Sequence, residues 1–258
     1  MENIKKLEFL TSLKFFSAVF FLILFFFNFL DIYIFELSRS FPGIFFNFFT
    51  NYIDPLSDIL DPFILIIFCG LILLLNSDIS LILKNENKLA VIKEKTGFSF
   101  DKISYLFNYL SLVCKHFIFS LTVAGILCNI FKYILGVSRP KYFFLEGYER
   151  MNFFNIEQKI NSFPSGHTQA AFTLAILLII YLNKYTFYIL FFACLMGLSR
   201  IFMSMHFPSD LIAGAYLGSI IPVFLYNCFY RKEIEKIKNK YDVFLTDIVK
   251  LLYWRFYI

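Results

Sequence analysis

Polar side chains that could do chemistry gather in three short clusters within an otherwise apolar chain. The clusters are Lys132 to Pro140 with Arg139 near its end, Pro164-Ser165-Gly166-His167, and Ser199-Arg200 followed by His206 and Asp210. They bring together cations, a carboxylate and two of the chain's 3 histidines. This combination is typical of a site that binds a phosphoryl group and transfers it.

A phosphate monoester carries up to about two negative charges, so it needs several fixed donors. Lys132, Arg139 and Arg200 could supply them, and the guanidinium fork matches the spacing of phosphate oxygens. The Pro-Ser-Gly-His cluster predicts the start of a helix, where free backbone N–H groups bind anions. Ser165 would add a hydroxyl donor at that point.

Phosphoryl transfer also needs a nucleophile and an acid for the leaving oxygen. His206 and Asp210 are four residues apart, and a carboxylate that holds one ring nitrogen leaves the other free to attack phosphorus. His167 could then protonate the leaving alkoxide and later activate water to hydrolyse a phosphohistidine. No carboxylate cluster has the spacing of metal ligands, so we predict no metal and no other cofactor.

These motifs resemble those of the type 2 phosphatidic-acid phosphatase superfamily, the membrane lipid phosphate phosphatases. The family pattern is Lys-x6-Arg-Pro, then Pro-Ser-Gly-His, then Ser-Arg-x5-His-x3-Asp, and the chain matches each specified position over a core of about 112–226. The resemblance implies that His206 is the nucleophile, Asp210 its partner and His167 the general acid. The phosphate ligands that it implies are Lys132, Arg139, Ser165, Gly166 and Arg200.

The resemblance also implies a membrane lipid as the substrate partner. The family includes phosphatidylglycerophosphatase B, undecaprenyl-diphosphatase and lipid A 1-phosphatase types in bacteria, and enzymes acting on phosphatidate. The sequence does not choose among these lipids; residues 147–160 are the candidate for headgroup selection. Two alternatives stay open: a lipid phosphotransferase on the same scaffold, and a non-catalytic lipid-binding membrane protein, against which the intact His167, His206 and Asp210 argue.

The composition predicts an all-α polytopic membrane protein. Hydrophobic residues make up 59% of the chain, against about 45–50% in soluble domains, and they lie in long runs. We predict six transmembrane helices, an external loop over 36–61, and an interfacial elbow over 103–114. The predicted spans are about 15–30, 62–83, 115–132, 165–182, 186–203 and 210–230.

The distribution of charge predicts how the chain is oriented. The net charge is +5, and the basic residues crowd the N-terminus, the segment 84–102 and the tail from 231. By the positive-inside rule these parts are cytoplasmic, which explains the charge without nucleic acid. All three clusters then fall on the outer face. We expect one integral-membrane domain over 1–258 in a bacterial inner membrane, with both termini cytoplasmic, the site facing the periplasm and an amphipathic tail over 231–258. The oligomeric state stays open.

Overall fold

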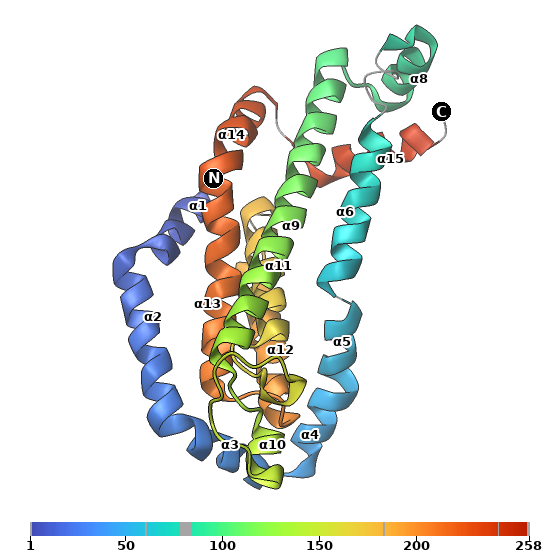
Figure 1. Ribbon diagram of the computed structural model, residues 1–258. Helices are drawn as coiled ribbons and strands as arrows, with labels where there is room; N and C mark the ends of the chain where they lie inside the picture. Colours follow the sequence, from blue (N-terminus) through green and yellow to red (C-terminus); the bar gives the residue numbers. More distant parts are fainter. Residues whose placement is uncertain (1, 60, 78–83, 183, 242, 257–258) are drawn as a thin grey trace. The chain divides into compact units, whose positions relative to one another are not determined.

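The computed structural model describes residues 2–59, 61–77, 84–182, 184–241 and 243–256 (Figure 1). These residues form helices and loops, and the only β-type pairing among them is one bridge between Val137 and Met151. The all-α prediction is therefore confirmed. In chain order the helices of the described residues are α1 (Glu2–Leu7), η1 (Glu8–Thr11), α2 (Leu13–Phe25), η2 (Phe26–Leu30), α3 (Asp31–Ser40), α4 (Gly43–Phe48), η3 (Phe49–Ile53), α5 (Asp54–Ile59), α6 (Pro62–Ser77), α8 (Glu86–Thr96), α9 (Phe100–Leu135), α10 (Pro140–Glu146), η4 (Gln158–Ile160), α11 (Gly166–Leu182), α12 (Thr186–Phe202), α13 (Pro208–Leu225), η5 (Tyr226–Tyr230), α14 (Arg231–Lys240) and α15 (Leu245–Phe256).

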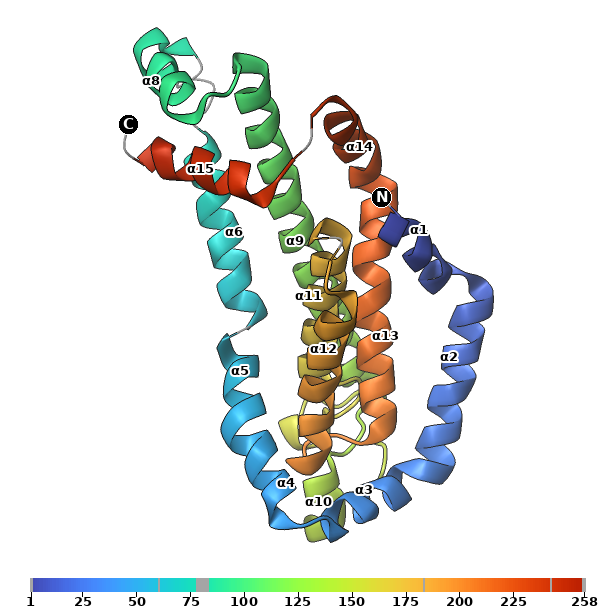
Figure 2. The ribbon, with the colours of Figure 1, turned by 180° about the vertical axis from the view of Figure 1, so that it is seen from behind.

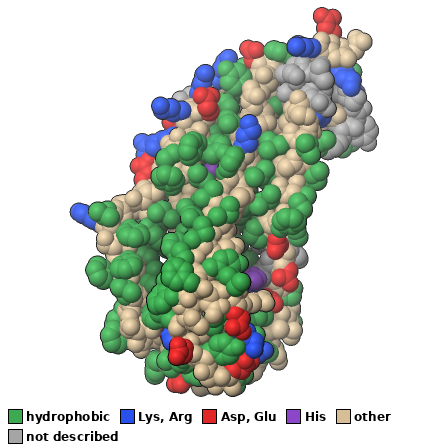
Figure 3. All heavy atoms as spheres, viewed as in Figure 1, with side chains coloured by type: hydrophobic (Ala, Val, Ile, Leu, Met, Phe, Trp, Pro, Cys, Tyr) green, Lys and Arg blue, Asp and Glu red, His purple; other side chains and the backbone are tan. Residues whose placement is uncertain are grey.

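Among the described residues, three helices are long and apolar enough to cross a membrane. They are Leu13–Ser40, Phe100–Leu135 and Pro208–Lys238. Three shorter apolar helices, α6, α11 and α12, have 16, 17 and 17 residues, where a bilayer core needs about 20. Each of these six helices contains or overlaps one predicted span, and residues 78–83 of the predicted span 62–83 lie outside the described residues. That the chain crosses the membrane six times stays a prediction. Hydrophobic side chains cover much of the face in Figure 3, as expected of a surface in contact with lipid.

The chain divides into two compact units, the first made of residues up to 64 and 120–224, the second of 65–119 and 225–258. Whether the two units act as one domain stays a prediction. In the first unit α11 packs along α12 (Figure 2). η3 packs against α12 as well. A buried apolar cluster lies between them, made of Phe49, Ile53, Ala171, Ala175, Ala193 and Met196.

Two glycines let α13 approach α11 closely. A Cβ on Gly214 would lie 2.5 Å from the carbonyl oxygen of Ser165, and one on Gly218 would lie 2.2 Å from the carbonyl oxygen of Gln169. No other residue type fits at such distances without moving the backbone. Because Ser165 belongs to the second polar cluster and α13 carries the third, this contact sets the distance between the two.

The second unit has a core of its own. Ile92 of α8, Leu106 of α9 and Leu251 of α15 are among the buried side chains that form it. An ion pair of 2.8 Å joins Lys102 to Asp247 at the start of α15. The side chain of Leu245 on α15 is exposed. The amphipathic character of the tail and its place on the inner leaflet stay predictions.

The segment 36–61, expected to be an external loop, is largely helical in its described residues. The helix that begins in the predicted first span continues to Ser40, and α4, η3 and α5 follow. The reason is helical spacing of aromatic residues: Phe41, Phe45 and Phe49 are four apart. All three rings contact Phe202 of α12. Tertiary packing therefore stabilises helix where Pro42, Gly43 and Pro55 suggest loop.

The elbow expected over 103–114 is also wrong, because α9 is one continuous helix of 36 residues. Kinks in helices arise at proline, at glycine or where a side chain enters the hydrogen-bond ladder. Residues 103–124 contain neither proline nor glycine, and Lys115 and His116 are accommodated within the helix. Lys115 and His116 therefore do not interrupt the helix.

Candidate active site

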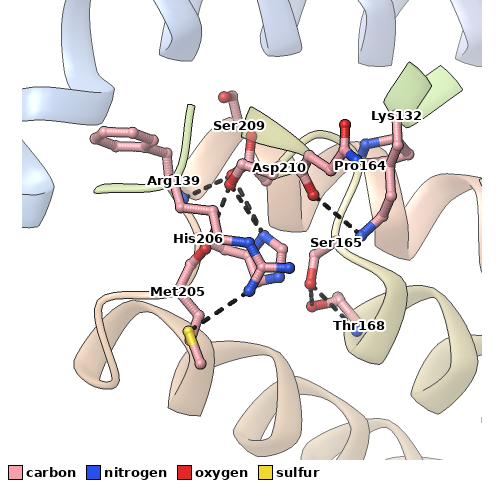
Figure 4. Close-up of polar contacts among 12 residues, drawn as sticks. Lys132, Arg139, Pro164, Ser165, Thr168, Met205, His206, Ser209 and Asp210 are labelled. Atoms are coloured by element: carbon pink, nitrogen blue, oxygen red, sulfur yellow. Dashed lines mark hydrogen bonds and ion pairs between the residues drawn. The ribbon is translucent and has the colours of Figure 1, made fainter. Parts of the chain in front are cut away.

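All eight residues predicted to form the site lie within the first unit. They come from the end of α9, the residue before α10, the start of α11, the end of α12, the turn before α13 and the first turn of α13. Figure 4 labels Lys132, Arg139, Ser165, His206 and Asp210 among them. The predicted residues are Lys132, Arg139, Ser165, Gly166, His167, Arg200, His206 and Asp210.

Lys132 lies in the last turn of α9, against the beginning of α11. Its ammonium donates to the carbonyl oxygen of Asn161 at 3.2 Å. A Cβ added to Gly166 would be 3.8 Å from Lys132 Nζ, so the lysine reaches the first residue of α11. A cation at a helix C-terminus is stabilised by the helix dipole. The structure thus brings Lys132 of the first cluster next to Gly166 of the second cluster, as predicted for two phosphate ligands.

Gly136 follows the last residue of α9. Its φ is +52°, and a Cβ there would lie 1.8 Å from the carbonyl oxygen of Asn152, so only glycine fits. Three residues later Arg139 precedes α10, with Pro140 as the first helical residue. Arg139 Nη1 lies 3.6 Å from Met205 Sδ. Its Nε is buried with no hydrogen-bond partner among the described residues, which leaves a donor for an anion.

Ser165 caps α11, and its hydroxyl oxygen is buried. The oxygen accepts from the backbone N–H of Thr168 at 3.4 Å and from the Thr168 hydroxyl at 2.9 Å. This is the bonding of an N-cap residue, and it uses the acceptor positions of the hydroxyl while its own proton stays available for donation. His167 is the second residue of α11, is exposed, and lies within electrostatic range of Arg200 and Lys132.

Arg200, in the last turn of α12, is 4% exposed and forms an ion pair with Asp54 of α5. Its Nε also donates to the hydroxyl of Ser199 at 3.2 Å. Sequence reasoning did not foresee Asp54, because the segment that carries it was expected to be loop. Arg200, which is predicted to bind phosphate, therefore contacts the carboxylate of Asp54 in the same unit.

The predicted pair of His206 and Asp210 is brought together, but through a third residue. His206 is 2% exposed and Asp210 is 0% exposed. The distance from His206 Nδ1 to Asp210 Oδ2 is 3.5 Å, longer than an ordinary N–H···O bond. The hydroxyl of Ser162 lies between them, 3.2 Å from Nδ1 and donating to Oδ2 at 2.5 Å.

Sequence reasoning missed Ser162. Its only signal is its position two residues before Pro164, because serine is common in loops and carries no spacing of its own. Because Ser162 donates its single hydroxyl proton to the Asp210 carboxylate, its oxygen can act only as an acceptor toward Nδ1–H of His206. That favours the tautomer with a lone pair on Nε2, the nitrogen available for attack on phosphorus.

Asp210 also joins the third cluster to the second. Its Oδ2 accepts the backbone N–H of Phe207 at 2.8 Å, and its carbonyl oxygen accepts the N–H of Ser165 at 3.0 Å. Its Oδ1 is buried with no hydrogen-bond partner among the described residues. The backbone bond fixes the start of α13 directly against the start of α11.

His206 is neutral at physiological pH. Burial lowers the pKa of its imidazole to about 4, while Asp210 acts in the opposite direction and Lys132 and Arg139 add to the lowering. Only the neutral ring has a free nitrogen lone pair, so this environment keeps His206 in the nucleophilic form.

Two further side chains that sequence reasoning did not single out hold the same turn. Asp31 of α3 accepts the N–H and the hydroxyl proton of Ser209, and it forms an ion pair with Arg150. Neither residue belongs to a polar cluster of the sequence, and the three residues lie far apart along the chain. Only the folded chain places them beside Asp210.

Comparison with known proteins identifies the family. Residues 114–234 match the model of the PAP2 superfamily, and the match contains all three polar clusters. This stretch is a PAP2 superfamily domain. The predicted resemblance to the type 2 phosphatidic-acid phosphatases is therefore confirmed, and the apolar helices make the chain an integral membrane protein.

Several PAP2 relatives resemble this chain in part. A "Lipid A 1-phosphatase" of Rhizobium johnstonii is 33% identical over 115 residues, which cover 43% of this chain and 46% of that protein. "Bacitracin transport permease protein BcrC" of Bacillus licheniformis is 39% identical over 72 residues, 28% of this chain and 36% of that protein. "Lipid phosphate phosphatase 1" of Arabidopsis thaliana is 26% identical over 141 residues, 44% of this chain and 43% of that protein.

The chain thus matches less than half the length of these relatives. No solved structure matches it significantly.

Proposed function

We propose that this protein is a membrane lipid phosphatase that hydrolyses a phosphate or diphosphate ester through a phosphohistidine on His206. The observation that carries the proposal is the buried, neutral His206, joined to Asp210 through the hydroxyl of Ser162. Lys132 and Arg139 lie within electrostatic range of its ring. A neutral nucleophile beside fixed cations is what attack on an anionic phosphoryl group requires.

In the first half-reaction, His206 Nε2 forms a bond to phosphorus and the bond from phosphorus to the lipid oxygen breaks. His167 gives its proton to that leaving oxygen. The imidazole acquires positive charge as it is phosphorylated, and Asp210 stabilises this charge through Ser162. In the second half-reaction water attacks phosphorus, His167 takes the proton, and inorganic phosphate leaves His206.

The cations of the site balance the charge of the transferring group. Lys132, Arg139 and Arg200 are the side chains for this role, with the Ser165 hydroxyl and the backbone N–H of Gly166 at the start of α11. Positive charge fixed before the substrate arrives needs no reorganisation during the reaction, which is why it lowers the barrier.

The substrate is a phosphorylated lipid of the membrane in which the protein lies. Two relatives carry names that specify a lipid phosphatase, one for lipid A 1-phosphate. Lipid A 1-phosphate, undecaprenyl diphosphate, phosphatidylglycerol phosphate and phosphatidate are the candidates. We place the site at the periplasmic face of a bacterial inner membrane with both termini cytoplasmic, since the basic segments lie in the N-terminus, 84–102 and the tail.

Product analysis tests the proposal. The protein, purified in detergent with EDTA present, is incubated with each of the four lipids separately and then together, while free phosphate and lipid masses are measured. We expect phosphate release from at least one lipid, retained in EDTA and absent in His206→Ala. A phosphate gained by a second lipid would indicate a phosphotransferase, and loss of activity on chelation would contradict the metal-independent mechanism.

A matched pair of cation variants sharpens the test. Arg139 and Lys141 are two residues apart, but Lys141 is exposed and lies outside the predicted ligand set. Arg139→Ala should lower kcat/KM by about 100-fold or more, as removal of a charged transition-state donor does. Lys141→Ala should stay within about twofold of the wild type, as surface substitutions do. Equal losses would remove Arg139 from the phosphate site.

A further inference from the structure

Asp31, the first residue of α3, is a buried carboxylate beside the candidate site. It is 1% exposed and lies outside the segment 114–234 that matches the PAP2 superfamily. Its Oδ1 accepts the backbone N–H of Ser209 at 2.8 Å, and its Oδ2 accepts the Ser209 hydroxyl proton at 2.5 Å. A buried charge is costly unless it is paired, so its persistence here calls for an explanation.

The position of Ser209 gives that explanation. Ser209 is the second residue of α13, and the first four N–H groups of a helix have no partner within it. Asp31 therefore caps α13 from a different helix, where negative charge is also favoured by the helix dipole. Asp210, the next residue along, belongs to the same first turn.

Arg150 completes the contact from the loop that follows α10. Its guanidinium forms an ion pair with Asp31. The same group lies over the ring of Phe207, 3.5 Å from the ring centroid, and over Phe27 of η2 at 4.6 Å. Phe207 is 0% exposed, so Arg150 closes one side of a buried ring.

We propose that Asp31 and Arg150 form a clasp that positions the turn from His206 to Asp210 for phosphoryl transfer. The clasp holds Ser209 through Asp31 and Phe207 through Arg150, while the residues proposed to act in the reaction are His206 and Asp210 on either side. The two held residues carry no chemistry themselves. Asp31 and Arg150 are positioning residues, and this role rests on the proposed function.

The expected signature follows from that role. A misplacement of about 1 Å in a catalytic group costs about 100-fold in rate, because the reacting atoms no longer meet in line. Both carboxylate oxygens of Asp31 are engaged by Ser209 and Arg150, so its loss should affect the chemical step and leave substrate binding unchanged. The clasp therefore predicts a fall in kcat without a rise in KM.

The first test neutralises the carboxylate without changing its size. Asp31→Asn should lower kcat by about 10- to 100-fold and leave KM within about twofold. The control is Glu36→Gln, which makes the same change at an exposed position of the same helix and should match the wild type. A rise in KM with kcat unchanged, or an Asp31→Asn variant as active as Glu36→Gln, would overturn the clasp.

The second test asks whether Asp31 and Arg150 act together. Arg150→Gln leaves a buried carboxylate without its cation, the more damaging half of a broken ion pair. We expect kcat to fall further in Arg150→Gln than in Asp31→Asn, and to recover in the double variant to about the Asp31→Asn value. Independent structural roles would instead give multiplied losses, which would contradict the clasp.

A third measurement separates failure of the clasp from failure of the proposed function. If the wild type releases no phosphate from any of the four lipids, the proposed function fails and the clasp is tested by vanadate, which mimics pentacoordinate phosphorus. Vanadate should raise the melting temperature of the Glu36→Gln protein more than that of Asp31→Asn. Equal rises in melting temperature in the two variants would overturn the clasp. If Asp31→Asn does not fold, Ser209→Ala takes its place, and vanadate should again stabilise it less than Glu36→Gln.

Discussion

The turn from His206 to Asp210 and the pair of Arg200 with Asp54 differ in how their side chains are held. His206 and Asp210 are almost fully buried and are joined by the Ser162 hydroxyl and by backbone groups. Arg200 is held by a charged partner, and the neighbouring His167 is exposed. A phosphate can displace the carboxylate that binds a guanidinium, because both are anions. The hydrogen bonds to Asp210 join groups of the protein that no anionic substrate would displace.

This difference matches what each region would do in phosphoryl transfer. A nucleophile has to be held within a narrow geometry, and the buried hydrogen bonds from Ser162 and Phe207 to the Asp210 carboxylate provide that. A phosphate-binding group has to release product after each turnover, so a competing carboxylate nearby is compatible with its role. The comparison predicts that perturbing the first region mainly affects kcat and that perturbing the second mainly affects anion binding.

The largest effect is expected where the two polar clusters are joined. Gly214→Ala puts a Cβ 2.5 Å from the carbonyl oxygen of Ser165 and should push α13 from α11. We expect a loss of about 1–3 kcal/mol in stability and most of the activity, measured by melting temperature in detergent and by phosphate release. Gly125→Ala is the matched control, because nothing lies within 4 Å of its Cβ position. Equal stability of the two variants would contradict the close approach.

Next in size is the removal of the hydroxyl between His206 and Asp210. Ser162→Ala leaves the buried carboxylate without one of its donors, which costs about 1–3 kcal/mol. If this cost falls on the transition state, kcat drops by about 5- to 150-fold. Ser199→Ala, whose hydroxyl donates to the backbone of Met196 and accepts from Arg200, should affect kcat less and phosphate binding more. A kcat for Ser162→Ala within twofold of the wild type would show that Asp210 acts on His206 without the bridge.

A moderate effect is expected from pH. Because burial lowers the pKa of His206 to about 4, against about 6.5 for a free histidine, the ring stays neutral in the folded protein across that interval. We expect the acid limb of kcat/KM, corrected for ionisation of the substrate phosphate, to lie near pH 4. A limb near pH 6.5 would show that His206 is solvated.

The same shift has a consequence for stability. Between about pH 6.5 and about pH 4, His206 is protonated in the unfolded chain but stays neutral in the folded protein. The contribution of His206 to stability is therefore fully present above about pH 6.5 and is lost as the pH falls to about 4. Comparing the pH dependence of the melting temperature in the wild type and in His206→Ala measures it.

The smallest effect is expected at Asp54. Asp54→Asn removes the carboxylate that competes for Arg200, and a partly exposed ion pair contributes about 0.2–1 kcal/mol. Inhibition by inorganic phosphate should therefore become about two- to fivefold tighter, with kcat little changed. Asp58→Asn, an exposed position one turn later on α5, is the control. Unchanged inhibition in Asp54→Asn would show that the pair does not compete with phosphate.

The sequence by itself determined the local features of this protein. The all-α class follows from long apolar runs, and the end of α9 at Gly136 and the start of α11 after Ser165 follow from residues that act within one or two turns of the backbone. The three clusters could be recognised because their spacing is local as well. The PAP2 domain identified over 114–234 agrees with that reading.

Only the tertiary structure decided which residues support the clusters. Ser162, Asp54 and the pair of Asp31 with Arg150 carry no periodic signal, because each acts across a contact between distant parts of the chain. The close approach of α13 to α11 at Gly214 is of the same kind. A sequence pattern indicates which backbone conformation a residue prefers. The partner of a buried charge is instead set by helix packing, which brings Asp31 against Ser209.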